Sequence, residues 1–252
     1  MTRTQAPELT QLQDQVALVT GAGRGLGAEI ARALAQSGCR VAVADLDPAL
    51  AERTAGEIDK AGGHALPVVL DVAEPKAARE AVDRVVSHFG SLDILVNNAG
   101  TDVTKSIDEL SFEEWDRVLA TNLRGPFVLS KVALDALRRG DQGRGGQILN
   151  VASTAAKRCW PNASAYHASK WGLVGLSHAL HAELRPHGVR VSTLVAGGMR
   201  TPFLLDRFPG IDESKLQDPA NVAWAVRFLL SMPRESVIPE MMVLPVQETS
   251  WP

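Results

Sequence analysis

Cysteine is scarce in this chain, with only Cys39 and Cys159 among 252 residues. The two are far apart, no CxxC spacing occurs and there is no second pair. The sequence therefore predicts neither a disulfide framework nor a structural zinc site, and it favours a reducing, intracellular setting. We expect both cysteines to act as small buried hydrophobes.

Long apolar runs are also missing. No stretch of about eighteen apolar residues occurs, and the first fifteen residues lack the apolar core of a signal peptide. The sequence thus predicts no membrane span and no secretion, and we expect a cytoplasmic protein. Lys and Arg number 26 against 29 Asp and Glu, for a net charge of −3. Because no basic surplus or stripe is present, nucleic-acid binding is not predicted.

Short apolar runs alternate with segments of helical periodicity after a polar tail, residues 1–13. Strands are predicted at 16–19, 41–44, 65–70, 92–96, 147–151, 189–195 and 241–244. Helices are predicted at 26–37, 48–61, 75–88, 111–137, 164–185 and 219–231. This alternation is typical of an α/β protein with a parallel sheet covered by helices on both faces. Because no linker or repeat divides the chain, we predict one domain over 14–252.

A glycine-rich turn, Thr20-Gly-Ala-Gly-Arg-Gly-Leu-Gly27, joins the first predicted strand to the first predicted helix. Glycine allows a sharp turn and a close approach of backbone to a pyrophosphate, which the helix N-terminus favours. No Gly-Lys-Ser/Thr follows, so a nucleoside triphosphate loop is disfavoured. The alternative is a turn with a purely structural role, but the strand-turn-helix context favours dinucleotide binding.

Two acidic residues end predicted strands. Asp45 lies eighteen residues after Gly27, near the spacing of an acid that binds a ribose 2′-hydroxyl, which favours NAD over NADP. It could instead cap the next helix, although Asp47 before a proline is the better cap. Arg24 is the counter-argument, because its guanidinium could bind a 2′-phosphate. Asp71 is a candidate either for the adenine amino group or for a helix cap.

The candidate catalytic residues are Tyr166 and Lys170, with Ser153 thirteen residues before the tyrosine. Tyr166 is the only tyrosine of the chain. At i and i+4 on a predicted helix, the two side chains project from one face. A nearby ammonium group lowers the pKa of a phenol and makes it a proton donor or acceptor for alcohol and carbonyl chemistry. The alternative is an exposed helical pair without function.

In combination, these motifs resemble the short-chain dehydrogenase/reductase family. The resemblance is ordered along residues 14 to 245 and rests on TGAGRGLG at 20–27, Asp71, Asn97-Asn98-Ala99-Gly100, Asn122, Ser153 and YHASK at 166–170. It implies a single-domain, Rossmann-like, doubly wound parallel sheet of about seven strands. The nicotinamide cofactor would lie across the carboxyl ends of the strands.

The resemblance also implies a role for each matching residue. Tyr166 would be the general acid/base, Lys170 would bind the nicotinamide ribose and lower the pKa of Tyr166, Ser153 would orient the substrate, and Asn122 would anchor a water that links Lys170 to solvent. The turn at residues 97–100 can serve both packing and cofactor contact. The implied cofactor-binding residues are Gly21, Arg24, Gly25, Leu26, Gly27, Asp45, Asp71, Val72, Asn98, Gly100, Tyr166, Lys170, Gly197 and Thr201.

The predicted function is an NAD-preferring oxidoreductase, with NADP possible, that transfers hydride between nicotinamide and a secondary alcohol or carbonyl compound. The resemblance implies a homotetramer or dimer joined through two long helices. One alternative is an NADPH-dependent 3-oxoacyl (acyl-carrier-protein) reductase. Another is a non-catalytic dinucleotide-binding regulatory or scaffold protein, although the intact set of proton-transfer residues argues against it.

The sequence departs from the family pattern at three places. Ala196 replaces the usual proline after the sixth predicted strand and Gly198 adds freedom, so we expect a less ordered loop there. The segment 203–216 is short for a substrate lid, but its apolar residues make it a candidate cover over the substrate. The usual terminal Asp-Gly-Gly is missing, and the tail with Trp251 is expected to pack differently, for example across an oligomer interface.

Four further side chains are expected to have structural roles. His178 and His181 lie one turn apart without a carboxylate cluster, so a solvated helix face is favoured over a metal site. Trp160 is expected to serve mainly in packing, with substrate contact as the alternative. His167 points about 100° away from Tyr166 on a helix and is expected to be structural.

Overall fold

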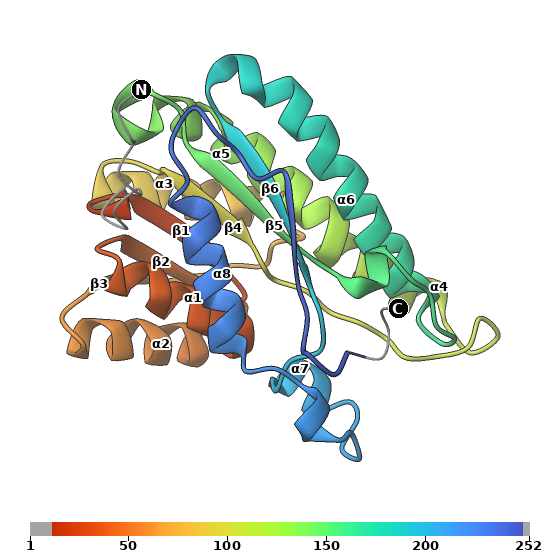
Figure 1. Ribbon diagram of the computed structural model, residues 1–252. Coiled ribbons are helices and arrows are strands. Elements are labelled where there is room, and N and C mark those ends of the chain that lie inside the picture. Colours follow the sequence, from red (N-terminus) through yellow and green to blue (C-terminus); the bar gives the residue numbers. More distant parts are fainter. Residues whose placement is uncertain (1–11, 249–252) are drawn as a thin grey trace, which may run out of the picture.

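Seven parallel strands form one sheet in the computed structural model, which describes residues 12–248 (Figure 1). The order across the sheet is β3-β2-β1-β4-β5-β6-β7. The strands are β1 (Val16–Thr20), β2 (Arg40–Asp45), β3 (His64–Val69), β4 (Ile94–Asn97), β5 (Gln147–Ser153), β6 (Arg190–Ala196) and β7 (Glu240–Val243). The predicted α/β fold with a parallel sheet is confirmed, and each predicted strand is present within two residues of its expected start.

Helices connect successive strands, as the alternation predicts. They are α1 (Gly25–Gln36), α2 (Pro48–Lys60), α3 (Pro75–Phe89), α4 (Phe112–Leu119), α5 (Gly125–Gly143), α6 (Ser164–Leu184), α7 (Pro202–Leu205) and α8 (Pro219–Leu230). The helix predicted over 111–137 is present as a continuous helical run, in which a π-helical segment, Ala120–Arg124, lies between α4 and α5. The short helix α7 was not predicted.

Local capping explains several helix starts. Asp47 precedes Pro48, and its carboxylate accepts hydrogen bonds from the Ala49 and Leu50 amides, which confirms Asp47 as the cap of α2. Ser111 begins α4 with a capping box, because its hydroxyl accepts from the Glu114 amide and the Glu114 side chain accepts from the Ser111 amide. These side chains satisfy amides that the first helical turn leaves without partners.

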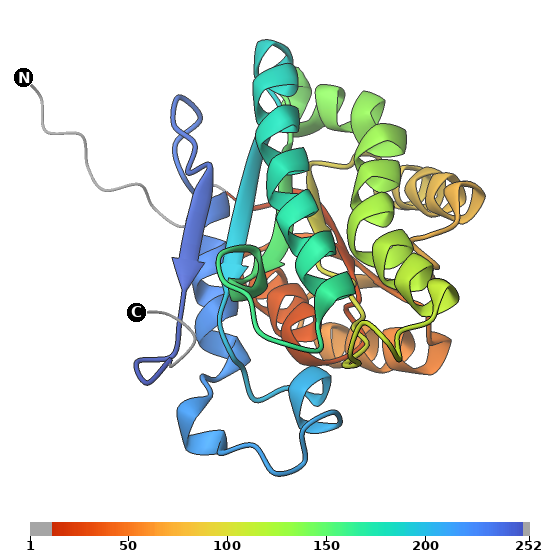
Figure 2. The ribbon, with the colours of Figure 1, turned by 90° about the vertical axis from the view of Figure 1, so that its right-hand side faces the viewer.

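The sheet separates two apolar cores. One core packs α1, α2 and α8 against the sheet, and the other packs α3 and α5 against the opposite face. Figure 2 shows α5 and α6 side by side on the face turned toward the viewer. The strands β1 and β4 are buried along their whole length, which agrees with their continuous apolar sequence.

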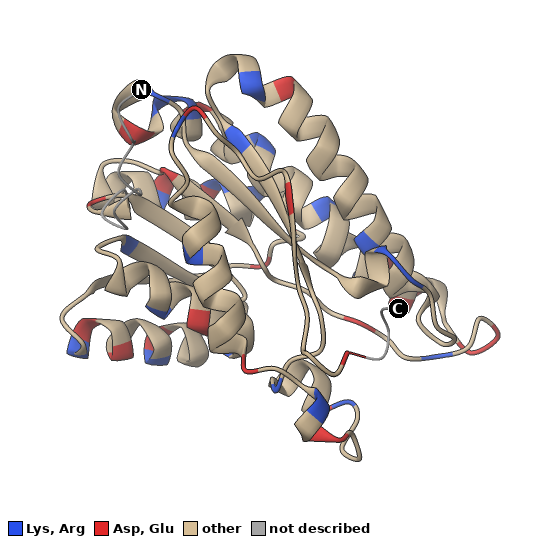
Figure 3. Ribbon diagram, in the orientation of Figure 1, with Lys and Arg blue, Asp and Glu red and all other residues tan. Residues whose placement is uncertain are grey.

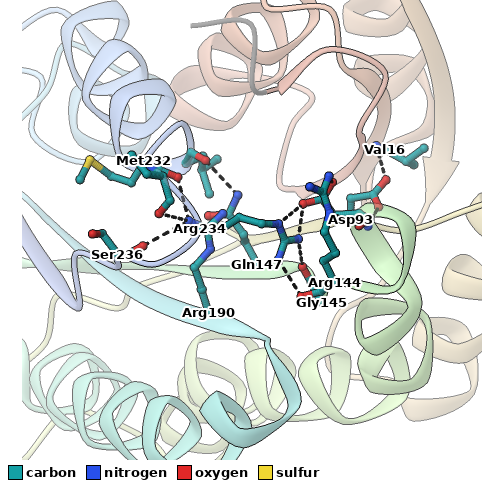
Figure 4. A network of polar contacts seen from close by, with 12 residues as sticks. Val16, Asp93, Arg144, Gly145, Gln147, Arg190, Met232, Arg234 and Ser236 are labelled. Carbon is teal, nitrogen blue, oxygen red and sulfur yellow. Dashed lines mark hydrogen bonds and ion pairs between the residues drawn. The ribbon is translucent and has the colours of Figure 1, made fainter. Parts of the chain in front are cut away.

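A network of polar contacts closes the amino-terminal edge of the sheet (Figure 4). Buried Asp93 accepts hydrogen bonds from the Val16 amide at 2.7 Å, from the Ser91 hydroxyl at 2.9 Å and from the Asp141 amide. Arg234 pairs with Asp141 and donates to the Arg144 and Gly145 carbonyls. Each buried carboxylate oxygen of Asp93 is thus satisfied, as burial of a charged group requires.

The carboxyl edge of the sheet contains the point where the strand order reverses. β1 lies between β2 and β4, so the connections after β1 and after β4 run to opposite faces. In open parallel sheets a crevice forms at such a point, outside the carboxyl ends of the strands. The glycine turn follows β1 and the Asn98-Ala99-Gly100 loop follows β4, so both lie at this crevice.

The two cysteines differ. Cys39 is buried, as expected, and burial raises the pKa of its thiol to about 12, with a further contribution from the charge of Asp93. Cys159 is exposed, so the expectation that it is buried is wrong. It lies in the connection between β5 and α6, which runs over the surface. Most of the tail predicted for residues 1–13, and Trp251, lie outside the described residues, but Leu12 is fully buried.

Charge is mixed over the surface. Figure 3 shows basic and acidic residues interspersed along helices such as α2. Among the helices within residues 12–248, none is both long and apolar enough to cross a membrane.

Candidate active site

A cavity of about 960 Å³ lies at the carboxyl edge of the sheet. Every residue proposed above for catalysis or cofactor binding lines it, with the exception of Asn122. Sequence positions from the glycine turn to the loop after β6 therefore meet at one site. The lining residues that the sequence predicted are Gly21, Arg24, Gly25, Leu26, Gly27, Asp45, Asp71, Val72, Asn98, Gly100, Ser153, Tyr166, Lys170, Gly197 and Thr201.

The glycine turn is packed too closely for side chains. Gly21 has a φ of +61°, and a Cβ at Gly27 would lie 2.1 Å from the Gly21 carbonyl oxygen. The Asn98 side chain donates to the Thr20 and Gly21 carbonyls, at 2.9 Å and 3.2 Å, and fastens the turn to the loop after β4. Bare backbone and a helix N-terminus thus line one end of the cavity, which fits a dinucleotide pyrophosphate.

Asp45 stands at the same end of the cavity. Its carboxylate accepts from the Gly23 amide at 2.8 Å and from the Asp47 amide at 3.1 Å, so it is fixed against the glycine turn. Arg24 reaches the other way and pairs with Asp206 at 3.3 Å, with both side chains more than half exposed. Asp71 accepts from the Ala73 amide at 2.9 Å.

The structure bears on the two alternatives for Asp71, a contact with the adenine amino group and a helix cap. The N-cap of α3 is Glu74, so Asp71 does not cap that helix. Asp71 instead lines the cavity beside Val72. This position agrees with the alternative in which the carboxylate faces the adenine.

The three candidate catalytic side chains meet at the other end of the cavity. Ser153, at the end of β5, lies near enough to Tyr166 for its hydroxyl to lower the pKa of the phenol. Lys170 Nζ lies 5.7 Å from the centre of the Tyr166 ring and donates to the Val151 carbonyl at 2.8 Å. Tyr166 and Lys170 are 8% and 5% exposed, so neither is the exposed helical side chain of the alternative reading.

Burial dominates the ionisation of both groups. It raises the pKa of Tyr166 to about 12, against the lowering effect of the nearby Ser153 side chain. Among nearby charges, Asp102 raises and Arg207 lowers the pKa of Tyr166. Burial lowers the pKa of Lys170 to about 8, while the charge of Asp102 raises it. The low-dielectric surroundings disfavour phenolate and ammonium alike.

Asn122 acts as a bridge outside the cavity. It lies in the π-helical segment, a feature that often occurs at functional sites. Its side chain accepts from the Thr101 amide at 2.8 Å and donates to the Thr101 carbonyl at 2.8 Å and the Ser169 hydroxyl at 3.0 Å. Because Ser169 lies on α6, Asn122 connects the loop after β4 to the helix of Tyr166 and Lys170.

The connection between β5 and α6 forms a wall of the cavity. His167 is buried, and its ring contacts the Ala155 carbonyl at 2.8 Å through Nδ1 and accepts from the Trp160 amide at 3.1 Å through Nε2. The Trp160 ring packs edge-on against that of His167. His167 is thus structural, as expected, while Trp160 both packs and lines the cavity.

The loop after β6 is held by hydrogen bonds despite its two glycines. Gly197 donates to the Val243 carbonyl at 2.9 Å, and Gly198 donates to Glu248 at 3.3 Å. Gln217 donates to the Gly198 carbonyl and accepts from the Arg200 amide. We expected a less ordered loop because of Ala196 and Gly198. Hydrogen bonds to residues much later in the chain instead hold this loop in place.

Two charged residues at the substrate end, Asp102 and Arg207, escaped the sequence reasoning. Both line the cavity, and they form an ion pair at 3.4 Å. Neither belongs to a motif, and 105 residues separate them. The one available signal was proximity in sequence, Asp102 to Gly100 and Arg207 to the apolar segment 203–216. Within residues 12–248, no group of three His, Cys, Asp or Glu is arranged to hold a metal ion.

Comparison with known proteins agrees with this geometry. The family model for short chain dehydrogenase matches residues 15–210. The chain belongs to the short-chain dehydrogenase/reductase family. It is 41% identical to a D-threitol dehydrogenase from Mycolicibacterium smegmatis over 76% of this chain and 74% of that protein.

Solved structures of this family share the fold. A 3-ketoacyl-(acyl-carrier-protein) reductase from Brucella melitensis, complexed with NADH, has a TM-score of 0.85 and 36% identity, covering 94% of this chain and 99% of that one. A metagenomic short-chain oxidoreductase in complex with NADP has a TM-score of 0.82 and 33% identity, covering 94% and 99%. The chain is an NAD(P)-dependent short-chain oxidoreductase that acts on CH–OH groups or the corresponding carbonyls.

A Gly27→Ala substitution tests the glycine turn. Because the new Cβ would meet the Gly21 carbonyl oxygen, the turn must shift, and we expect NADH affinity to fall at least about tenfold, or unfolding free energy to fall by about 1–3 kcal/mol. Fluorescence titration and urea unfolding measure the two effects.

Gly56→Ala is the matched control. Gly56 lies inside α2 with open space around its Cβ position, so alanine should stabilise the protein by about 0.5–1 kcal/mol and leave NADH binding unchanged. Equal behaviour of the two variants would contradict the role given to the turn.

Proposed function

We propose that this protein is an NAD-preferring oxidoreductase that transfers hydride between nicotinamide and a secondary alcohol or carbonyl substrate, with Tyr166 as general acid/base. The observation that carries the proposal is the buried Tyr166 in the cavity wall, where Ser153 also lies and where Lys170 Nζ is 5.7 Å from the centre of the tyrosine ring. A dinucleotide-binding scaffold has no need of this arrangement, which supports an enzyme over the non-catalytic alternative.

When bound, the nicotinamide supplies the acceptor or donor of hydride. The residues of the chain handle the proton: Tyr166 takes it from the substrate hydroxyl during oxidation and returns it to the carbonyl oxygen during reduction. Ser153 holds the same substrate oxygen by a hydrogen bond. Without cofactor, burial holds the pKa of Tyr166 at about 12, so the lowering by Lys170 that the family resemblance implies is not found, and the neutral phenol suits proton donation in the direction of reduction. Oxidation requires the phenolate, which the ammonium form of Lys170 and the positive charge of a bound nicotinamide would favour.

Three observations support NAD as the preferred cofactor. The carboxylate of Asp45 lines the cavity at the glycine turn, where it would accept from a ribose 2′-hydroxyl and repel a 2′-phosphate. The next residue, Leu46, is 67% exposed and offers no charge. Arg24 is paired with Asp206.

An NADPH-dependent 3-oxoacyl reductase is the second candidate. The presence of Arg24 in the cavity wall favours the cofactor of this candidate. The likeness to the Brucella melitensis reductase favours its reaction but not its cofactor, because that reductase is complexed with NADH. The exposed pair of Arg24 with Asp206 is weak enough to exchange for a phosphate. Asp45 remains the argument against this candidate.

We also propose a homo-oligomer joined through α5 and α6, which lie side by side in Figure 2. Phe127 on α5 and Trp171 on α6 are 46% and 50% exposed, and Phe127 borders a groove with Leu119, Leu123 and Leu176. Exposed apolar area of this kind is typical of a contact between proteins.

Tyr166→Phe tests the mechanism. Removal of the phenol oxygen takes away the proton donor, and we expect turnover of secondary alcohols to fall by about 10²- to 10⁴-fold. NADH affinity and thermal unfolding should remain near those of the unmodified protein, because the ring is retained. Steady-state kinetics on a panel of secondary alcohols, with NADH titration as the control, measures both. Unchanged turnover would disprove the assigned role.

Parallel fluorescence titrations with NADH and NADPH test the cofactor preference. We expect NADH to bind at least about tenfold more tightly, because the Asp45 carboxylate would repel a 2′-phosphate. Asp45→Ala should reduce the difference between the affinities for NADH and NADPH. Asp47→Ala is the matched control, since it removes a cap of α2 and costs about 1 kcal/mol of stability without a change in preference. An Asp45→Ala variant with the original preference would count against the assignment.

Light scattering tests the oligomer. The expected mass is two or four times 27.0 kDa, and Trp171→Glu should reduce it by introducing a charge into the contact. Val69→Glu, at an exposed position on the other side of the sheet, is the control and should leave the mass unchanged. A monomeric unmodified protein would refute this proposal.

A further inference from the structure

A largely buried carboxylate lines the cavity without a full set of hydrogen bonds. Asp102 lies in the loop after β4, its side chain is 8% exposed, and the residue lines the cavity. Its Oδ1 is buried and has no hydrogen-bond partner within the described part of the chain. Of the buried side-chain atoms left without a partner there, it is the one whose residue lines the cavity.

The other side of the carboxylate is held in place by Arg207. Arg207 donates to Asp102 Oδ2 and to the Asp102 carbonyl, each at 3.4 Å. The guanidinium lies over the Phe203 ring at 4.4 Å, and that ring is 5.9 Å from the Tyr166 ring. A continuous set of contacts thus leads from the acid/base to Asp102, and the ion pair engages Oδ2, whereas Oδ1 is closed to solvent.

Electrostatics also place Asp102 beside the reacting groups. Its charge raises the pKa of both Tyr166 and Lys170. Burial raises the pKa of Asp102 itself, while Arg207 and the Val103 amide lower it. A carboxylate in such surroundings is a strong hydrogen-bond acceptor, and leaving it without a donor is costly.

We propose that Asp102 is a specificity-determining residue, whose carboxylate accepts a hydrogen bond from a second hydroxyl group of the substrate. The preferred substrates are therefore polyols and the corresponding hydroxyketones. This inference rests on the proposed function, because it assumes that the first hydroxyl is held by Tyr166 and Ser153.

The chemistry of the carboxylate excludes other substrate classes. An ionised carboxylate only accepts hydrogen bonds, so it selects a donor such as a hydroxyl group. An alcohol with an apolar chain would cover the carboxylate without giving it a donor, which is the arrangement by which sites reject analogues that lack a hydroxyl. An anionic group at this position would be repelled by Asp102.

The test compares kcat/KM for the stereoisomers of 2,3-butanediol with that for 2-butanol. For the unmodified protein we expect the best diol to exceed the mono-alcohol by about 10- to 100-fold, as for a hydrogen bond to a charged group. Asp102→Leu removes the acceptor, so the ratio of kcat/KM for the best diol to kcat/KM for 2-butanol should fall to within about threefold of one. Asp102→Asn keeps the shape and a neutral acceptor, and should give an intermediate ratio.

Arg207→Met is the matched control. It removes the ion pair that holds the segment of α7 against the loop after β4, but it keeps the carboxylate. We expect it to lower kcat/KM for both alcohols while the diol remains preferred. NADH titration and thermal unfolding verify that each variant is folded and binds cofactor.

The outcomes separate this inference from the proposed function. A ratio near one in the unmodified protein, or a ratio that Asp102→Leu leaves unchanged, overturns the inference while Tyr166-dependent turnover still supports the function. If Asp102→Leu lowered kcat/KM equally for both alcohols, Asp102 would only hold the segment 203–216 in place through Arg207, and the inference would also be overturned. Diol turnover that survives Tyr166→Phe would instead refute the proposed mechanism. If the unmodified protein binds NADH in the titration but does not turn over any diol, the assignment of polyols as substrates is disproved.

Discussion

The rest of the structure depends on the junction between the ends of β1 and β4. The Thr20 hydroxyl donates to the Val96 carbonyl at 3.2 Å and accepts from the Asn98 amide at 3.0 Å. The Asn98 side chain returns two hydrogen bonds to the carbonyls of Thr20 and Gly21. Because the strand order reverses here, this junction sets the separation between the glycine turn and the loop after β4, and thereby the shape of the cavity.

Two buried carboxylates illustrate how the opposite edges of the sheet differ. Asp93, at the amino-terminal edge, uses both oxygens to accept from neighbouring amides and a hydroxyl (Figure 4). Asp102, at the carboxyl edge, is paired with Arg207 on one side and keeps Oδ1 without a donor. A satisfied group stabilises the fold, whereas a carboxylate in a cavity wall that lacks a full set of hydrogen bonds can accept one from a ligand. Burial has a second effect at this edge, since it shifts the pKa values of Tyr166 and Lys170 in opposite directions.

Sequence patterns predicted the sheet and most of the site because these features are local. The alternation of apolar runs, the glycine turn after β1 and the i, i+4 spacing of Tyr166 and Lys170 each depend on a few neighbouring residues. Motif residues at the ends of parallel strands meet at one edge, so the family resemblance placed them together correctly. The boundaries of β1, β2 and α2 were likewise predicted within a residue or two.

The sequence by itself thus determined the order of strands and helices, the glycine turn and the residues able to transfer a proton. Only the tertiary structure decided the pairing of Asp102 with Arg207, the π-helical segment around Asn122 and the exposure of Cys159. The physical reason is the range of the interactions. A periodic pattern records which face of an element is buried, but an ion pair between residues 105 positions apart forms only when separate elements pack together.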